Sequence, residues 1–134
     1  MRIHHLQGET IFNAYLVEKD ACAIIISYSG GTANLIDICQ LLKEKRVPII
    51  SITSLGVNPI SQLADVELHL STKEKLYSKI STFSTDAAIT YLLDVLYSCV
   101  FAQSYDKNVK LRKTASQKIE ASRLASSSVL KEDI

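Results

Sequence analysis

Three short apolar runs, separated by two patterns typical of helices, constrain the fold of this chain more than any other feature. The runs lie at 21–26, 47–53 and 66–70, and the helical patterns between them lie at 34–42 and 59–64. The first two runs are rich in isoleucine and are typical of buried strands, whereas the third alternates, as a strand nearer a sheet edge does. Strands that alternate with helices pair in parallel through right-handed crossovers. The sequence therefore predicts an α/β fold, a three-layer αβα sandwich around a mainly parallel sheet.

Composition and charge indicate how many domains the chain has and which class of ligand they disfavour. Its 134 residues are 47% hydrophobic and 22% charged, which fits one globular domain with a real core. We expect a single domain over 1–125 and a flexible tail over 126–134. The formal net charge of +1 creates no large positive field, so nucleic-acid binding by these residues alone is disfavoured.

Two observations on apolar segments predict a soluble, cytoplasmic chain. The segment 1–5, Met-Arg-Ile-His-His, lacks the apolar core of a signal peptide. We also expect no apolar stretch close to the roughly 20 residues that span a bilayer, and hence no membrane partner.

Further helices are expected on both sides of the strand region. A helix is predicted over Leu6–Val17, and an apolar helix over Ile80–Val100 that covers the sheet and presents a surface to a partner. Asn58 and Pro59 suit the N-cap and first position of the helix at 59–64. The cations in the helical pattern of 109–124 suit a solvated face, with an acidic or nucleic-acid partner as the alternative.

Cysteines and histidines give little support to catalysis or to metal binding. Cys22, Cys39 and Cys99 are odd in number, widely spaced and set in apolar surroundings, so we expect buried thiols in a reducing compartment. The three histidines show no spacing typical of metal ligands, and His69 fits a structural role in its strand. No metal ion and no other cofactor is expected.

The most chemically specific segment joins the first strand to the helix after it. Its sequence at 27–32 is Ser-Tyr-Ser-Gly-Gly-Thr. A helix N-terminus with hydroxyls and glycines around it can bind a phosphate, because its backbone N–H groups lack intrahelical partners. The segment has no lysine of a P-loop and no G-x-G-x-x-G pattern, which argues against a nucleotide. The alternative is an ordinary turn capped by Ser29 or Thr32.

A family resemblance favours a phosphosugar. Residues 27–32 resemble the S-x-S-G-x-T signature of sugar isomerase (SIS) domains, which bind phosphosugars. The segments 49–54 and 59–65 look like the next strand and its "L-A-D" turn, and 92–97 is similar to a helix common in C-terminal domains of RpiR-type transcriptional regulators. The resemblance runs from about Asp20 to Val100 and implies a SIS-like variant of the flavodoxin-like fold.

The resemblance also implies which residues bind. Ser27, Ser29 and Thr32 match the positions that bind the sugar phosphate, with the loop backbone at Tyr28, Gly30 and Gly31 assisting. Ser54 ends the neighbouring strand, where open parallel sheets collect ligands, although a serine there is often only a turn residue. Glu74 falls in a segment that resembles a ligand-adjacent stretch of the family, and an exposed loop glutamate is the alternative.

Three functions remain open at this point. The leading one is a phosphosugar-binding sensor domain of an RpiR-type regulator that works as a homodimer or larger homo-oligomer. The second is a sugar-phosphate isomerase, which needs a general base that we do not find. The third is a dimerisation module with a degenerate pocket. The usual SIS domain also has an earlier strand and glycine- and serine-containing loop, and RpiR-type regulators have a helix-turn-helix domain. We find neither in this sequence, and expect DNA contact only through a domain absent from this chain.

Overall fold

The computed structural model describes residues 7–18, 20–72, 74 and 82–120. The chain divides into two compact units, Met1–Leu92 and Leu93–Ile134. The predicted tail at 126–134 lies outside the described residues, and the single domain over 1–125 stays a prediction.

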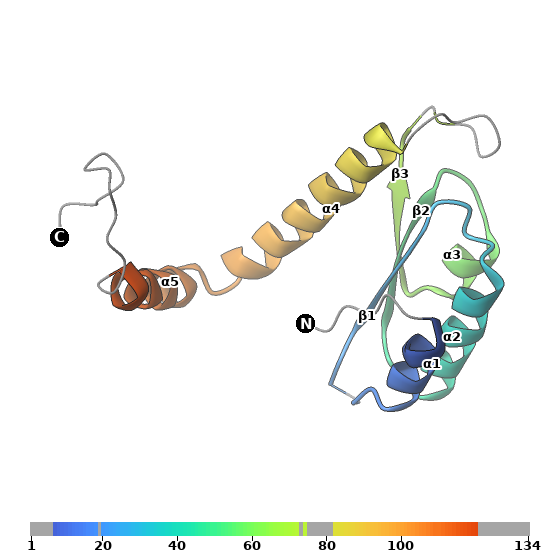
Figure 1. Cartoon of the computed structure of the whole chain (residues 1–134), viewed down its shortest axis with the longest axis horizontal. Coiled ribbons are helices and arrows are strands. Elements are labelled where there is room, and N and C mark those ends of the chain that lie inside the picture. Colours follow the sequence, from blue (N-terminus) through green and yellow to red (C-terminus); the bar gives the residue numbers. More distant parts are fainter. Residues whose placement is uncertain (1–6, 19, 73, 75–81, 121–134) are drawn as a thin grey trace. The chain divides into compact units, whose positions relative to one another are not determined.

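The first unit contains a three-stranded parallel sheet of order β1-β2-β3 (Figure 1). The strands are β1 (Ala23–Ser27), β2 (Ile49–Ser54) and β3 (Val66–Leu70). In the register, Ile50 lies between Ile24 and Val66. The predicted strands are confirmed, each to within two residues at either end. Because all three run the same way, their carboxyl ends lie along one edge of the sheet.

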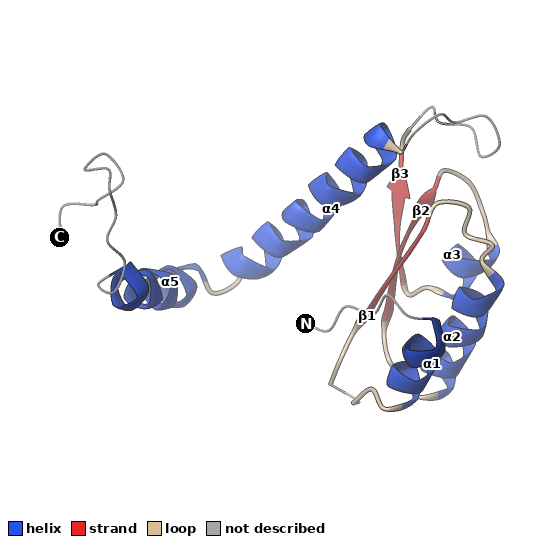
Figure 2. Ribbon diagram, viewed as in Figure 1, coloured by secondary structure: helices blue, strands red, loops and turns tan. Residues whose placement is uncertain are grey.

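Three helices lie on one face of this sheet, as Figure 2 shows. They are α1 (Gln7–Tyr15), α2 (Ala33–Glu44) and α3 (Pro59–Leu63). The predicted cap of α3 is confirmed: the Ser61 N–H donates to Asn58 Oδ1 at 2.9 Å, and the Asn58 N–H donates to Ser61 Oγ at 3.2 Å. Pro59 follows, because the first helical position needs no N–H donor.

The core of this unit lies between these helices and the sheet. Its members are buried apolar side chains of α1, α2, α3, β1 and β2, together with Val47, two residues before β2: Ala14, Ile25, Ile38, Cys39, Leu42, Val47, Ile49 and Ile60. Ile49, Ile60 and Cys39 have no exposed surface. The structure therefore has the predicted α/β architecture of a parallel sheet with flanking helices, consistent with a three-layer sandwich.

The second face of the sheet differs from the sequence expectation of strands buried on both sides. Ile24, Ile26 and Val66 are 41%, 38% and 50% exposed. Side chains alternate between the faces of a strand, and α1, α2 and α3 cover only one of them. The apolar run 21–26 therefore has side chains suited to burial on both faces of the sheet. In the described residues, helices cover one of these faces.

Two long helices follow, α4 (Phe83–Ala102) and α5 (Tyr105–Glu120), and the boundary between the two units falls inside α4. Thr85 is the buried residue of α4, whereas Tyr91 and Val100 are 69% and 59% exposed. Within the first unit, Phe83 and Tyr91 of α4 are 83% and 69% exposed, so these two side chains are not buried over the sheet as expected. Tyr97, Phe101 and Tyr105 form a row of ring contacts, with centroids 6.1 and 6.0 Å apart.

The composition of α4 also corrects the expectation about membrane-spanning stretches. Its 20 residues include a window of mean hydropathy 1.3, so by length and composition this helix could cross a membrane. The same test is passed by core helices of proteins outside membranes, and only 6% of this window is buried. The expectation failed because Asp86 and Asp94 interrupt the apolar sequence without lowering its mean hydropathy enough.

The cysteines correct a second expectation. Cys39 on α2 is buried, whereas Cys22 and Cys99 are exposed. Cys22 precedes β1, and Cys99 belongs to the uncovered α4, so their apolar neighbours in sequence do not enclose them. Burial raises the pKa of the Cys39 thiol.

Candidate functional site

The predicted binding loop, residues 27–32, connects β1 to α2 at the carboxyl edge of the sheet. The Ser27 and Thr32 hydroxyls lie 3.1 Å apart across it, and the Gly31 N–H donates to Ser29 Oγ at 3.3 Å. The Gly30 N–H donates to the Ser27 carbonyl at 3.1 Å, which closes the turn. The hydroxyls of Ser27, Ser29 and Thr32 and two glycines are thus gathered within six residues.

Thr32 occupies the N-cap position of α2, but its side chain makes no capping hydrogen bond. Its carbonyl accepts from the N–H groups of Leu35 and Ile36, and its hydroxyl turns to Ser27. Of the alternative turn capped by Ser29 or Thr32, the Thr32 side-chain cap is therefore absent, whereas Ser29 Oγ accepts from the Gly31 N–H within the turn. The partial positive charge of the α2 N-terminus faces a loop rich in hydroxyls.

Gly30 lies against the side chain of Asn58, a residue that the sequence analysis assigned only to a helix cap. Gly30 has a φ of +62°, and a Cβ there would lie 2.0 Å from Asn58 Oδ1. The Ile60 N–H donates to the Gly30 carbonyl at 3.0 Å, so the start of α3 is hydrogen-bonded to the loop. Only glycine fits both the left-handed backbone and the contact. No local pattern in the sequence links the loop at Gly30 to the loop at Asn58.

Ser54, the candidate at the end of β2, lies directly beside the loop. Its N–H donates to the Tyr28 carbonyl at 3.0 Å. Its own carbonyl lies 3.4 Å from Nδ1 of His69, whose Nε2 lies 3.6 Å from Glu67. Ser54 is thus joined to the loop through its backbone, and His69 has the structural partners expected of it.

Glu74, the candidate after β3, is brought to the same edge by Tyr28. The Tyr28 hydroxyl donates to the Glu74 carbonyl and accepts from the Thr72 hydroxyl at 3.1 Å. All the predicted site residues, from three different strand ends, are therefore connected to one loop by hydrogen bonds. Thr72 had no distinguishing signal in the sequence.

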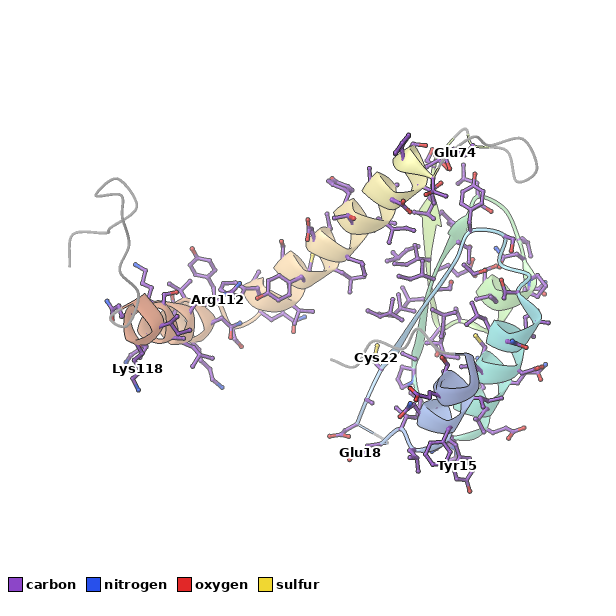
Figure 3. The ribbon with its side chains drawn as sticks, viewed as in Figure 1. Tyr15, Glu18, Cys22, Glu74, Arg112 and Lys118 are labelled. Carbon is purple, nitrogen blue, oxygen red and sulfur yellow. The ribbon has the colours of Figure 1, made fainter. Side chains whose placement is uncertain are left out.

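The carboxylate of Glu74 faces α4, as Figure 3 shows, beside the first turn of that helix. Its Oε1 accepts from the N–H groups of Ser84 and Thr85 at 3.0 and 3.2 Å, and from the Ser84 hydroxyl. Its Oε2 accepts from the Thr85 hydroxyl. The hydrogen bonds from the side chains of Ser84 and Thr85, and then from their N–H groups, lower the pKa of Glu74 to about 2.

Two of the pockets among the described residues lie away from the loop. One of about 210 Å³ sits at the amino ends of β2 and β3 and is lined by Lys43, Arg46, Val47, Pro48 and Asp65. Another of about 410 Å³ is lined by residues of α4 and α5, among them Phe101, Tyr105 and Arg112. In the part of the chain that the structure describes, no three His, Cys, Asp or Glu side chains are grouped to hold a metal ion.

Comparisons with known proteins bear on the family and the fold of this chain. The family model of the SIS domain matches residues 3–97. The uncharacterized HTH-type transcriptional regulator YbbH of Bacillus subtilis is 30% identical over 102 residues, which cover 76% of this chain and 35% of that protein. The uncharacterized HTH-type transcriptional regulator TTE0211 of Caldanaerobacter subterraneus subsp. tengcongensis is 30% identical over 113 residues, 84% of this chain and 39% of that protein.

A solved structure shares the fold. The NanR protein of Vibrio vulnificus, solved in complex with ManNAc-6P, matches with a TM-score of 0.72 and 18% identity, over 88% of this chain and 45% of that one. The chain thus spans less than half the length of each of these proteins. The expectation of a SIS domain, drawn from residues 27–32 and their flanks, is confirmed.

Proposed function

This chain belongs to the SIS domain family, and we propose that it is the phosphosugar-binding region of a transcriptional regulator of the RpiR type. In this proposal the chain binds its ligand and does not transform it. The relatives named above are HTH-type regulators, of which the chain spans 35% and 39%.

The observation that carries the proposal is the loop between β1 and α2. It places the Ser27 and Thr32 hydroxyls 3.1 Å apart at a helix N-terminus whose N-cap side chain does not cap. Hydroxyl donors and helix N–H groups bind phosphate without needing a lysine. Ser29, Gly31 and Thr32 are exposed, so a ligand can reach them.

We assign the phosphate contacts to Ser27, Ser29 and Thr32, with backbone help from Tyr28, Gly30 and Gly31. Ser54 is a weaker candidate, because the contact that joins it to the loop is made by its backbone N–H. Glu74 is weaker still, because both its carboxylate oxygens already accept hydrogen bonds from α4.

The test is calorimetric titration of the chain with ManNAc-6P, the ligand in the NanR complex, and with glucose 6-phosphate and fructose 6-phosphate. Unphosphorylated N-acetylmannosamine is the matched control ligand. We expect one phosphosugar to bind and to raise the Tm with concentration, as linkage requires. The unphosphorylated sugar should bind at least about tenfold more weakly, because charge-assisted hydrogen bonds supply much of the affinity.

Variants locate the binding. Ser29→Ala combined with Thr32→Ala should abolish the heat of binding, whereas Ser98→Ala, which removes an exposed hydroxyl from α4, should leave it unchanged. Binding that survives the double substitution would overturn the residue assignment.

The two alternative functions predict other outcomes. An isomerase would interconvert glucose 6-phosphate and fructose 6-phosphate, which NMR of the mixture detects directly. A dimerisation module with a degenerate pocket would bind none of the phosphosugars. The relatives are regulators, and this favours a binding role.

The partners of the whole protein follow from the same proposal. We assign DNA contact to a helix-turn-helix domain of a longer protein, and cytoplasmic location to a regulator of this kind. The exposed apolar side chains of α4, among them Tyr91, Val95 and Val100, would be covered in a homodimer or larger homo-oligomer. Light scattering at rising protein concentration measures the molar mass of the protein in solution. A mass that stays at the monomer value would contradict the proposed assembly.

A further inference from the structure

Glu74 uses its backbone and its side chain in two different directions. Its carbonyl accepts from the hydroxyl of Tyr28, which belongs to the candidate binding loop. Tyr28 accepts a second hydrogen bond from Thr72, at 3.1 Å, so its ring is anchored to the segment after β3 at two points. A change in the position of Glu74 therefore reaches the loop through Tyr28.

The side chain of Glu74 caps α4 from ten residues upstream of Ser84. It accepts from the N–H groups of Ser84 and Thr85, which lie in the first turn of the helix, and from both their hydroxyls. Thr85 is 3% exposed, so this cap includes the buried residue of α4. N–H groups in the first turn have no intrahelical acceptor, and the carboxylate satisfies two of them.

We infer that Glu74 is a positioning residue that holds the candidate binding loop and the first turn of α4 in one hydrogen-bonded unit. The part of this inference that concerns a ligand rests on the proposed function. A ligand that favours the ordered loop also favours the capped helix, and by linkage a capped helix raises affinity for the ligand by the same factor. The capped and uncapped states of α4 are the two states that the ligand distinguishes.

A direct contact between Glu74 and the sugar is the competing role. It would require a carboxylate oxygen to leave the hydroxyl and N–H groups of α4. The two roles differ in their dependence on Tyr28, because a direct contact with the ligand needs no Tyr28 hydroxyl.

The test begins without any ligand, with amide hydrogen exchange of the whole chain followed by NMR. Glu74→Ala should speed exchange of the Ser84 and Thr85 amides, and also of the Gly30 and Gly31 amides in the loop, each by about threefold to tenfold. Tyr28→Phe should speed exchange at the same two places. If Glu74→Ala changes only the α4 amides, Glu74 is merely a cap and the inference fails.

Asp86→Asn is the matched control. Asp86 is an exposed acidic residue in the first turn of α4, and its carboxylate accepts from the Thr82 hydroxyl at 2.7 Å. Its substitution should affect amides of that turn and leave Gly30 and Gly31 unchanged. Faster exchange of the loop amides in Asp86→Asn would mean that any disturbance of α4 reaches the loop, and would overturn a special role for Glu74.

The ligand arm uses ManNAc-6P as the probe. Glu74→Ala and Tyr28→Phe should weaken its binding by similar factors, and the double variant should bind no more weakly than either alone. Additive losses would show an independent contact of Glu74 with the ligand and contradict the inference. If the wild-type chain does not bind ManNAc-6P, the proposed function loses its support at this probe, while hydrogen exchange still decides the inference.

Discussion

The helix-covered face of the sheet and helix α4 have similarly apolar sequences and opposite surroundings. Ile49 and Ile60 are completely buried between the sheet and its helices, whereas Tyr91 and Val100 of α4 are 69% and 59% exposed. Apolar periodicity indicates that one face of a helix is suited to burial, but it does not indicate which part of the structure covers that face. In the covered face the partners are close in sequence, because β1, α2, β2 and α3 follow one another. Helix α4, by contrast, is followed in the sequence by a second helix, α5, and not by a further strand.

The same contrast explains why the candidate loop is well defined. It is fixed by contacts from three strand ends and from the start of α3, all on elements of the covered core. A binding site on such elements keeps its geometry without a ligand. The first turn of α4 joins this arrangement through Glu74.

The largest expected effect is on the covered face. Ile49→Ala should lower the free energy of unfolding by about 2 to 5 kcal/mol, since it leaves a cavity in the core. Val100→Ala on α4 should change it by less than about 0.5 kcal/mol. Urea denaturation measures both, and Ile49→Val, at about 0.5 to 1.5 kcal/mol, provides a milder variant that stays folded. Equal losses for Ile49→Ala and Val100→Ala would mean that α4 is buried in solution.

The next effect concerns the loop. Gly30→Ala should cost about 2 to 4 kcal/mol, from the strain of a positive φ and from collision with Asn58. Gly56→Ala has the positive φ without a neighbour within 4 Å, and should cost about 1 kcal/mol. Gly31→Ala has neither constraint and serves as the control.

A second substitution separates the two causes at Gly30. Asn58→Gly alone also removes the hydrogen bonds from Asn58 Nδ2 to Thr53 Oγ1 and to the Gly56 carbonyl. Gly30→Ala should therefore cost less in the Asn58→Gly background than in the wild type, by the part due to collision, as measured by urea denaturation. If the cost is the same in both backgrounds, the backbone strain at residue 30 accounts for the whole loss in Gly30→Ala.

Most of the fold of the first unit could be predicted from the sequence, because its signals are local. The isoleucine-rich runs predicted β1 and β2, the alternating run predicted β3, and Asn58 with Pro59 predicted the start of α3. Burial could not be predicted in the same way. The sequence around Cys22, Cys99 and Ile24 is apolar, yet these side chains are exposed, because exposure depends on which elements come to cover them.

The candidate site was predictable in its residues and not in its connections. Hydroxyls and glycines at 27–32 carry a recognisable pattern, and the pairing of Ser27 with Thr32 fits it. The Asn58 side chain lies against Gly30, and the Tyr28 hydroxyl donates to the Glu74 carbonyl. The two residues of the first pair are 28 positions apart in the sequence, and those of the second pair are 46 positions apart. Contacts at such separations follow from the topology of the sheet, and no local pattern encodes them.

The three cysteines offer a way to sharpen the contrast through accessibility. Cys22 and Cys99 should react with Ellman's reagent at least about tenfold faster than Cys39, whose burial hinders access and raises the pKa of the thiol. Cys22→Ser and Cys99→Ser assign each phase. If the rate at Cys99 falls as protein concentration rises while that at Cys22 does not, a second copy covers α4. Rapid reaction of Cys39 in the folded chain would contradict its burial.

The smallest expected effect is the pH dependence of the one carboxylate that joins the two regions compared above. The folded-state pKa of Glu74 is about 2, below its ordinary value of 4.5, because Ser84 and Thr85 donate hydrogen bonds to it. A depressed pKa contributes stability that is present above pH 4.5 and is lost as the pH falls toward 2. The difference in urea midpoint between the wild type and Glu74→Gln should therefore be constant above pH 4.5 and shrink below it. The difference for Ile49→Val, which removes only a buried methyl group, should not follow that curve. A Glu74→Gln difference that persists to pH 2 would mean that the cap does not need the ionised carboxylate, and that α4 is held to the loop by hydrogen bonding without charge.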